Sequence, residues 1–199
     1  MREGTNGTTP AGRNAAPRKV WTTKQMVTLA IFIAISAVLS FIETPPLIPA
    51  APYLKYDPSG VVSLVGSFIF GPVSGALIAL LSWVPHLGNP VGAVMNIFAA
   101  AALVIPAGLI YRRMHTQKGA ILGMVVGALL SIIVSIVLNF IATPLYFGGT
   151  VADVMKMVLP ILVPFNLIKV AINCVIVLLI YKPVHRMVDS LASNKKGAR

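Results

Sequence analysis

A single lysine inside a long apolar segment offers the clearest chemistry in this chain of 199 residues. Lys169 lies ten residues into the run from Leu159 to Tyr181, and a lysine at the centre of a membrane helix costs about 2.5–3.5 kcal/mol. Asn166 and Asn173 stand three residues before and four residues after it, so all three side chains share one helix face. No carboxylate lies on a neighbouring turn, so we expect the ammonium group to bind a ligand.

A second polar stripe lies in the preceding apolar run. Ser131, Ser135 and Asn139 follow one another at four-residue steps and also share a helix face. If the two stripes face each other, they form a patch suited to a compact polar ligand. The alternative for Ser131 and Ser135 is hydrogen bonding between helices, which is common for serine in membrane bundles.

Catalytic and metal sites find little support in the sequence. The three histidines lie in separate segments without the spacing of a metal pair, and the single cysteine excludes multi-cysteine clusters. The chain contains no Gly-Lys dipeptide, so it has no P-loop with which to hydrolyse ATP. We therefore predict no catalytic and no metal-ligating residues. One alternative, an intramembrane hydrolase, would use a dyad of Ser82 and Lys169.

The composition indicates that lipid surrounds the elements that carry these residues. Hydrophobic residues make up 57% of the chain and charged residues 11%, against about 25% charged in soluble domains, and the mean hydropathy is +0.87. These values argue against a soluble enzyme. The sequence predicts an all-α integral membrane protein with six transmembrane helices, over residues 25–42, 59–70, 72–87, 91–111, 119–146 and 159–181.

The positive charge is distributed as membrane topology requires, and this favours a membrane protein over a nucleic-acid-binding protein. The net charge is +11. With six spans, the two termini lie on the same side of the membrane, and thirteen lysines and arginines fall on that side. The opposite side carries only two, Lys55 and Lys156. We predict that both termini are cytoplasmic in a multi-pass protein of the cell membrane. Residues 1–24 and 186–199 are predicted to be basic cytoplasmic tails, the first of them disordered, around a single membrane domain at 25–185.

The segment from Glu43 to Ser59 contains five prolines, which hold it extended and stiff. We expect it to fold over the ligand as a lid and to contribute Tyr53 and Leu54 to the site. The alternative is static packing on the rim of the bundle. Trp83 is expected to form a wall of the site, with anchoring at the bilayer interface as its alternative.

Small residues at four-residue spacing form smooth strips on three predicted helices. Ala30 and Ala34 form the first strip. Gly71 and Gly75 form the second, and Gly123 and Gly127 form the third. Such strips allow close helix approach. The spacing alone does not show whether the partner helix is internal or belongs to another protein.

Six segments occur in an order that resembles one known family. They are AIFIA, PYLKYDPS, FGPVSGALIAL, NPVGAVMNIFAAA, LNFIATPLY and PFNLIK. Together, over roughly residues 24–185, they resemble the substrate-binding S components of energy-coupling factor (ECF) vitamin transporters, and most of all the riboflavin-binding members.

The resemblance implies a function and a set of partners. Such proteins bind one vitamin near the outer side under a loop lid, and they dock onto a transmembrane subunit that carries two ATPases. It implies that Asn139, Asn166 and Lys169 contact a flavin, that Ala30 and Ala34 form the docking strip, and that riboflavin is the transported ligand, with no cofactor.

One departure from the family pattern keeps alternatives open. Ser82 and Trp83 stand where riboflavin members often carry Lys-Asn. A different vitamin or a flavin analogue is therefore an alternative ligand. A non-transport protein, either an intramembrane enzyme or an assembly factor, is the alternative from another class.

Overall fold

The computed structural model describes residues 22–42, 44–86, 88–146, 148–183 and 186. Within these ranges the chain is helical and has no strand. The predicted tails at 1–24 and 186–199 lie almost entirely outside the described residues, as does Glu43 at the start of the predicted lid.

In the described part of the chain, seven α-helices form the bundle, with two short irregular helical segments. They are α1 (Thr23–Ser40), α2 (Ser59–Phe70), α3 (Pro72–Trp83), the 3₁₀ turn η1 (Val84–His86), α4 (Pro90–Met114), α5 (Gln117–Tyr146), α6 (Val151–Met157), the π-helical segment η2 (Val158–Leu162) and α7 (Val163–Leu179).

The predicted boundaries of the first five helices hold to within a few residues, but that of the last is wrong. Helical structure there begins at Val151 rather than at Leu159. Pro160 and Pro164 lack the backbone N–H groups that an α-helical ladder needs, and at this point the amide of Val163 donates to the carbonyl of Val158, five residues earlier. The chain therefore passes through this proline pair as a π-helical turn and stays helical.

Four of the helical stretches are long and apolar enough to cross a membrane. They are α1, α4, α5 and the continuous stretch from Val151 to Leu179, with mean hydropathies between 1.6 and 2.8. Large apolar side chains cover their outer surfaces, as Leu145, Leu159 and Leu179 show with exposed fractions of 81%, 80% and 78%. Such a surface suits lipid and not water, which is consistent with an integral membrane protein.

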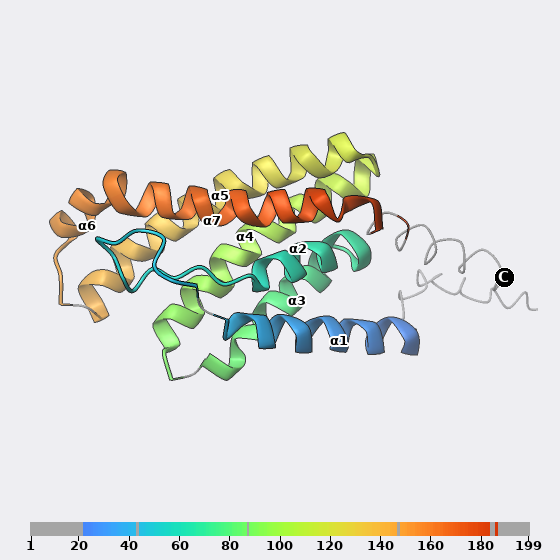
Figure 1. The fold of residues 1–199 in the computed structure, drawn as a ribbon, viewed down its shortest axis with the longest axis horizontal. Helices are drawn as coiled ribbons and strands as arrows, with labels where there is room; N and C mark the ends of the chain where they lie inside the picture. The colour runs from blue at the N-terminus through green and yellow to red at the C-terminus, as the bar shows by residue number, and fades with distance from the viewer. Residues whose placement is uncertain (1–21, 43, 87, 147, 184–185, 187–199) are drawn as a thin grey trace, which may run out of the picture.

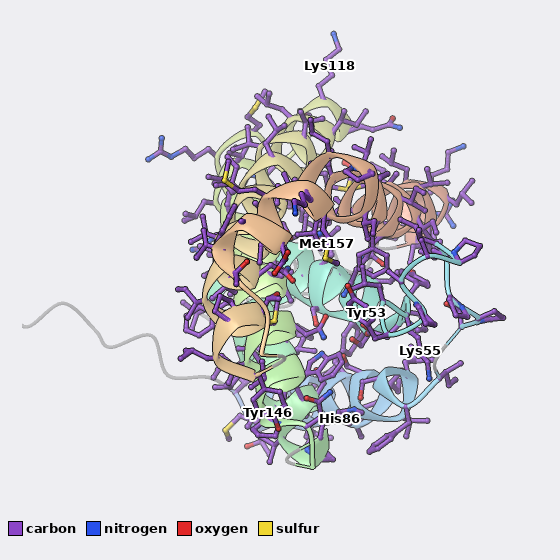
Figure 2. All side chains as sticks on the ribbon, turned by 90° about the vertical axis from the view of Figure 1, so that its left-hand side faces the viewer. Tyr53, Lys55, His86, Lys118, Tyr146 and Met157 are labelled. Atoms are coloured by element: carbon purple, nitrogen blue, oxygen red, sulfur yellow. The ribbon has the colours of Figure 1, made fainter. Side chains whose placement is uncertain are left out.

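The helices run back and forth between the two ends of an elongated bundle (Figure 1). The start of α1 and the end of α7 lie at one end. At the other end lie the segment 44–58, the turn η1 and α6, and we call this the loop end of the bundle. Figure 2 looks onto the loop end, where Tyr53, His86 and Tyr146 are labelled.

A glycine produces the sharp reversal between the two short helices. Gly71 has φ +102°, a conformation that residues with a Cβ rarely adopt, and Pro72 then begins α3 with a φ already suited to a helix. Hydroxyl groups join the helices side by side. Ser36 of α1 donates to the carbonyl of Ser59 at 3.3 Å, and Ser67 of α2 donates to that of Val104 at 2.6 Å.

Two of the predicted glycine strips pack inside the bundle. A Cβ added at Gly75 would lie 2.9 Å from the carbonyl oxygen of Ser63, and one at Gly123 would lie 2.8 Å from that of Ala107. These strips therefore allow α3 to approach α2, and α5 to approach α4. Ala30 and Ala34 differ, because both are exposed on the outer face of α1.

Candidate functional site

A small cavity lies where the loop segment meets the helices. Its volume is about 30 Å³, which is room for about two water molecules. The polar or aromatic side chains that line it are those of Asp57, Ser59, Trp83, Asn96, Ser131, Asn166, Lys169 and Asn173. The site therefore draws on the loop and on five helices, α2, α3, α4, α5 and α7.

Lys169 of α7 has two polar partners in this cavity. Its ammonium group donates to Oδ1 of Asn96 on α4 at 2.6 Å and lies 3.5 Å from Oδ2 of Asp57. The exposed fractions of the lysine and aspartate side chains are 17% and 8%, so the pair is largely shielded from solvent. The neighbouring turns of the helix carry no carboxylate, and the compensating charge comes instead from Asp57, in a distant part of the sequence.

Asp57 serves two elements with its two oxygen atoms. While Oδ2 faces the lysine, Oδ1 accepts from the backbone amide of Ser59 at 3.1 Å and also from the Ser59 hydroxyl. These bonds place a carboxylate at the N-terminus of α2, where the helix dipole stabilises negative charge. Asp57 is thus held in position by the start of α2 as well as by Lys169.

Tyr56 fastens the same part of the loop to α7. Its hydroxyl donates to Oδ1 of Asn173 at 2.8 Å, and its carbonyl accepts from the backbone amide of Thr44 at 3.1 Å. Burial and the neighbouring Asp57 carboxylate raise the pKa of Tyr56 to about 12, so the phenol stays protonated and keeps donating at neutral pH. The lack of a side chain at Gly60 leaves room for the Asn173 amide, since a Cβ there would lie 2.5 Å from Nδ2.

The structure brings together three of the six predicted ligand-binding residues. Trp83, Asn166 and Lys169 line the cavity. Asn139 is not among the lining residues, and its amide donates to the carbonyl of Ser135 at 2.8 Å within α5. Tyr53 and Leu54 lie on the loop, outside the lining.

Other lining residues were not singled out from the sequence as ligands. Asn96 carries no charge and has no polar neighbour at helical spacing, although it belongs to the segment NPVGAVMNIFAAA. Asp57 lies in the predicted lid segment from Glu43 to Ser59 and was not predicted as a ligand. Ser131 donates to the carbonyl of Ala99 at 2.8 Å. This is a hydrogen bond between helices, the alternative role that the sequence analysis gave to this serine.

The hydrolase dyad finds no support in the geometry. The Ser82 hydroxyl donates to the carbonyl of Ala79 at 3.1 Å, while the Lys169 ammonium donates to Asn96. The two groups are thus engaged with different partners, and Ser82 does not line the cavity. Within the described ranges, no group of three or more His, Cys, Asp or Glu side chains is placed to hold a metal ion.

Comparison with known proteins points to one family. Residues 24–181 match the family model described as "ECF transporter, substrate-specific component". The chain is 35% identical over 170 residues to "Riboflavin transporter RibU" of Staphylococcus aureus (strain TCH60), covering 80% of this chain and 89% of that protein. It is 27% identical over 173 residues to "Riboflavin transporter FmnP" of Bacillus subtilis (strain 168), covering 79% of this chain and 90% of that protein.

A solved structure has a similar fold. It is described as "Structure and mechanism of the S component of a bacterial ECF transporter". The TM-score is 0.71 at 32% sequence identity, and the match covers 83% of this chain and 97% of that one.

The ion pair between Asp57 and Lys169 predicts a specific pattern of stability. Asp57→Asn and Lys169→Met should each lower the thermal stability of the protein in detergent by about 1–3 kcal/mol, because each leaves a shielded charge without its partner. The double variant should recover much of that loss. Thermal unfolding of the four proteins measures the coupling.

The exposed pair Asp153 and Lys156, whose nitrogen and oxygen are 3.9 Å apart, serves as the control and should show no measurable coupling. If the effects of the Asp57 and Lys169 substitutions add to within about 0.3–0.5 kcal/mol, the two side chains do not interact.

Proposed function

The chain belongs to the ECF transporter substrate-specific components, and we propose that it captures riboflavin from outside the cell for uptake driven by ATP-hydrolysing subunits. The family match agrees with the resemblance predicted from the six sequence segments, and its members are transport components rather than enzymes. The observation that carries the proposal is the polar cluster around Lys169, which lies inside an apolar bundle and has no catalytic arrangement around it.

The lining of the cavity is suited to the chemistry of riboflavin. The isoalloxazine ring is flat with apolar faces, so an aromatic wall such as Trp83 can pack against it. The ring-edge carbonyls and nitrogens and the ribityl hydroxyls need hydrogen-bond donors and acceptors, which Asn96, Asn166, Lys169 and Asn173 supply. Asn139 is proposed as a further contact, reached once the ligand has widened the cavity toward α5.

Binding requires the loop end to open. A cavity with room for about two water molecules cannot hold the flavin ring. The groups that close it include loop residues, since Tyr56 bonds to Asn173 and Asp57 pairs with Lys169. The segment 44–58, which carries Tyr53 and Leu54, therefore acts as the lid. Its polar contacts with α7 are exchanged for contacts with the vitamin.

The proposed topology has six membrane crossings with both termini in the cytoplasm. The short helices α2 and α3 form the second and third crossings inside the bundle, where α1 and α4 cover them. Near the end of the bundle where α1 begins and α7 ends lie the basic residues Lys24, Arg112, Arg113, Lys118 and Lys182. Lys55 and Lys156 lie toward the loop end, so the positive-inside rule puts the loop end outside the cell.

The exposed strip on α1 is the proposed docking surface. Ala30 and Ala34 point away from the bundle, and alanines let another helix approach closely. The partners we propose are the transmembrane coupling subunit and the two ATPase subunits of an ECF transporter. A different vitamin or a flavin analogue remains the alternative ligand, because Trp83 departs from the family pattern.

Riboflavin binding tests the proposal directly. The protein purified from cells supplied with riboflavin should be yellow, and titration of the apoprotein should quench the fluorescence of added riboflavin. The double variant Asp57→Asn/Lys169→Met, in which neither charge is left unpaired, should stay folded but bind about 1–3 kcal/mol more weakly, because a charged hydrogen bond to the ligand is lost. Lys156→Met should bind as the wild type does.

A colourless protein that neither retains nor binds riboflavin would contradict the proposal. Mass spectrometry of any molecule carried through purification would then identify the actual ligand and separate another vitamin from no ligand at all.

Docking on α1 gives a separate expectation. Ala34→Trp should leave riboflavin binding by the isolated protein intact, while it abolishes riboflavin uptake and co-purification with the transporter subunits, because the indole prevents close helix approach. The matched control is Ala171→Trp, which places the same bulk at an exposed alanine of α7. Equal uptake by the two variants would exclude the α1 strip as the docking surface.

A further inference from the structure

Three aromatic side chains stack on one another at the loop end of the bundle. The ring of His86 has its centroid 4.4 Å from that of Trp83 and 4.3 Å from that of Phe41, with interplanar angles of 39° and 31°. Trp83 also lines the cavity. The imidazole therefore lies against the same indole that forms a wall of the proposed vitamin site. Figure 2 shows His86 beside α1 at this end of the molecule.

The local fold of the chain builds this stack. The helix α3 ends at Trp83 and tightens into the 3₁₀ turn η1 at Val84–His86. In a 3₁₀ turn the side chains of residues i and i+3 eclipse each other, so His86 comes to lie over Trp83. Pro85 has a φ fixed by its ring, which stiffens the turn.

The buried hydroxyl group of Ser40 forms a hydrogen bond with the imidazole of His86 and so helps to hold the ring in its orientation. Oγ of Ser40 lies 2.7 Å from Nε2 of His86, 2.7 Å from the carbonyl oxygen of Ala37 and 3.2 Å from that of Ser82. The Ser40 hydroxyl and Nε2 of His86 therefore share a hydrogen bond whose direction follows from the imidazole tautomer, and the same hydroxyl lies against two backbone carbonyls. Because Ser40 is the last residue of α1, the stack is also tied to that helix.

We propose that His86 is a positioning residue for riboflavin, which holds the indole of Trp83 in the orientation on which the flavin ring packs. This inference rests on the proposed function. The role follows from two contacts of the indole, which packs against the ring of His86 and also lines the cavity. It also explains the departure from the family pattern at Ser82-Trp83, since this chain has an aromatic wall, Trp83, together with a residue that holds it in place, His86.

Two substitutions of similar volume separate positioning from simple packing. His86→Leu fills the space without a ring, whereas His86→Phe keeps a ring on Trp83. His86→Leu should weaken riboflavin binding about three- to tenfold, the range expected for the loss of one aromatic pair, and His86→Phe should bind within about twofold of the wild type. Equal affinities of the two variants would overturn the inference.

A double-variant comparison tests whether His86 acts through Trp83. In the background of Trp83→Ala, the further change His86→Leu should have no effect on the dissociation constant. Additive losses would show that His86 acts by another route and would overturn the proposal. If the wild type itself fails to bind riboflavin, the proposed function fails. If the wild type binds riboflavin and the His86 variants bind it with the same affinity, the positioning role alone fails.

A measurement without ligand reports on the same contact. In a Trp21→Phe background the fluorescence emission comes from Trp83 alone. His86→Leu should shift this emission, because the indole loses its imidazole neighbour, whereas the control His115→Asn at the opposite end should not. An unshifted emission in His86→Leu would mean that the imidazole does not hold the indole, and the inference would fall.

Discussion

The ammonium group of Lys169 must be compensated inside an apolar bundle, and the rest of the site depends on how this is done. Asp57 provides the opposite charge with one carboxylate oxygen, and with the other it accepts from the backbone amide of Ser59 at the start of α2. Asn96 on α4 provides a hydrogen-bond acceptor at 2.6 Å. One cation thus joins the loop, α2, α4 and α7. A ligand that takes over any of these contacts must also change how the loop is held.

The loop end can therefore be understood as a closed form of a binding site. Its cavity has a volume of about 30 Å³, and the loop is fastened to α7 through Tyr56 and Asp57. Trp83, which also lines the cavity, packs against His86, and Ser40 ties His86 to the end of α1. The helix that carries the proposed docking strip thus also contacts the support of the proposed vitamin wall.

The sequence predicted the helices and part of the site well, because apolar runs and i+3 and i+4 spacing are local signals. Helical spacing singled out Lys169 and Asn166, whereas Trp83 was proposed only as an aromatic wall, and the family resemblance rested on six ordered segments. The Asp57 partner was missed because it lies more than a hundred residues away and reaches Lys169 only through the path of the loop. The early start at Val151 was missed because the apolar run begins only at Leu159, after the charged residues Asp153 and Lys156. A π-helical turn joins the two parts into one helical stretch.

The most direct test of this account is hydrogen exchange at the backbone amides of residues 51–60 in the ligand-free protein. Lys169→Met should speed exchange there about tenfold or more, because a charged interaction that closes the loop is lost, while the amides of α4 and α5 away from the cavity should keep their protection. Unchanged exchange in this segment would contradict the claim that Lys169 holds the loop closed.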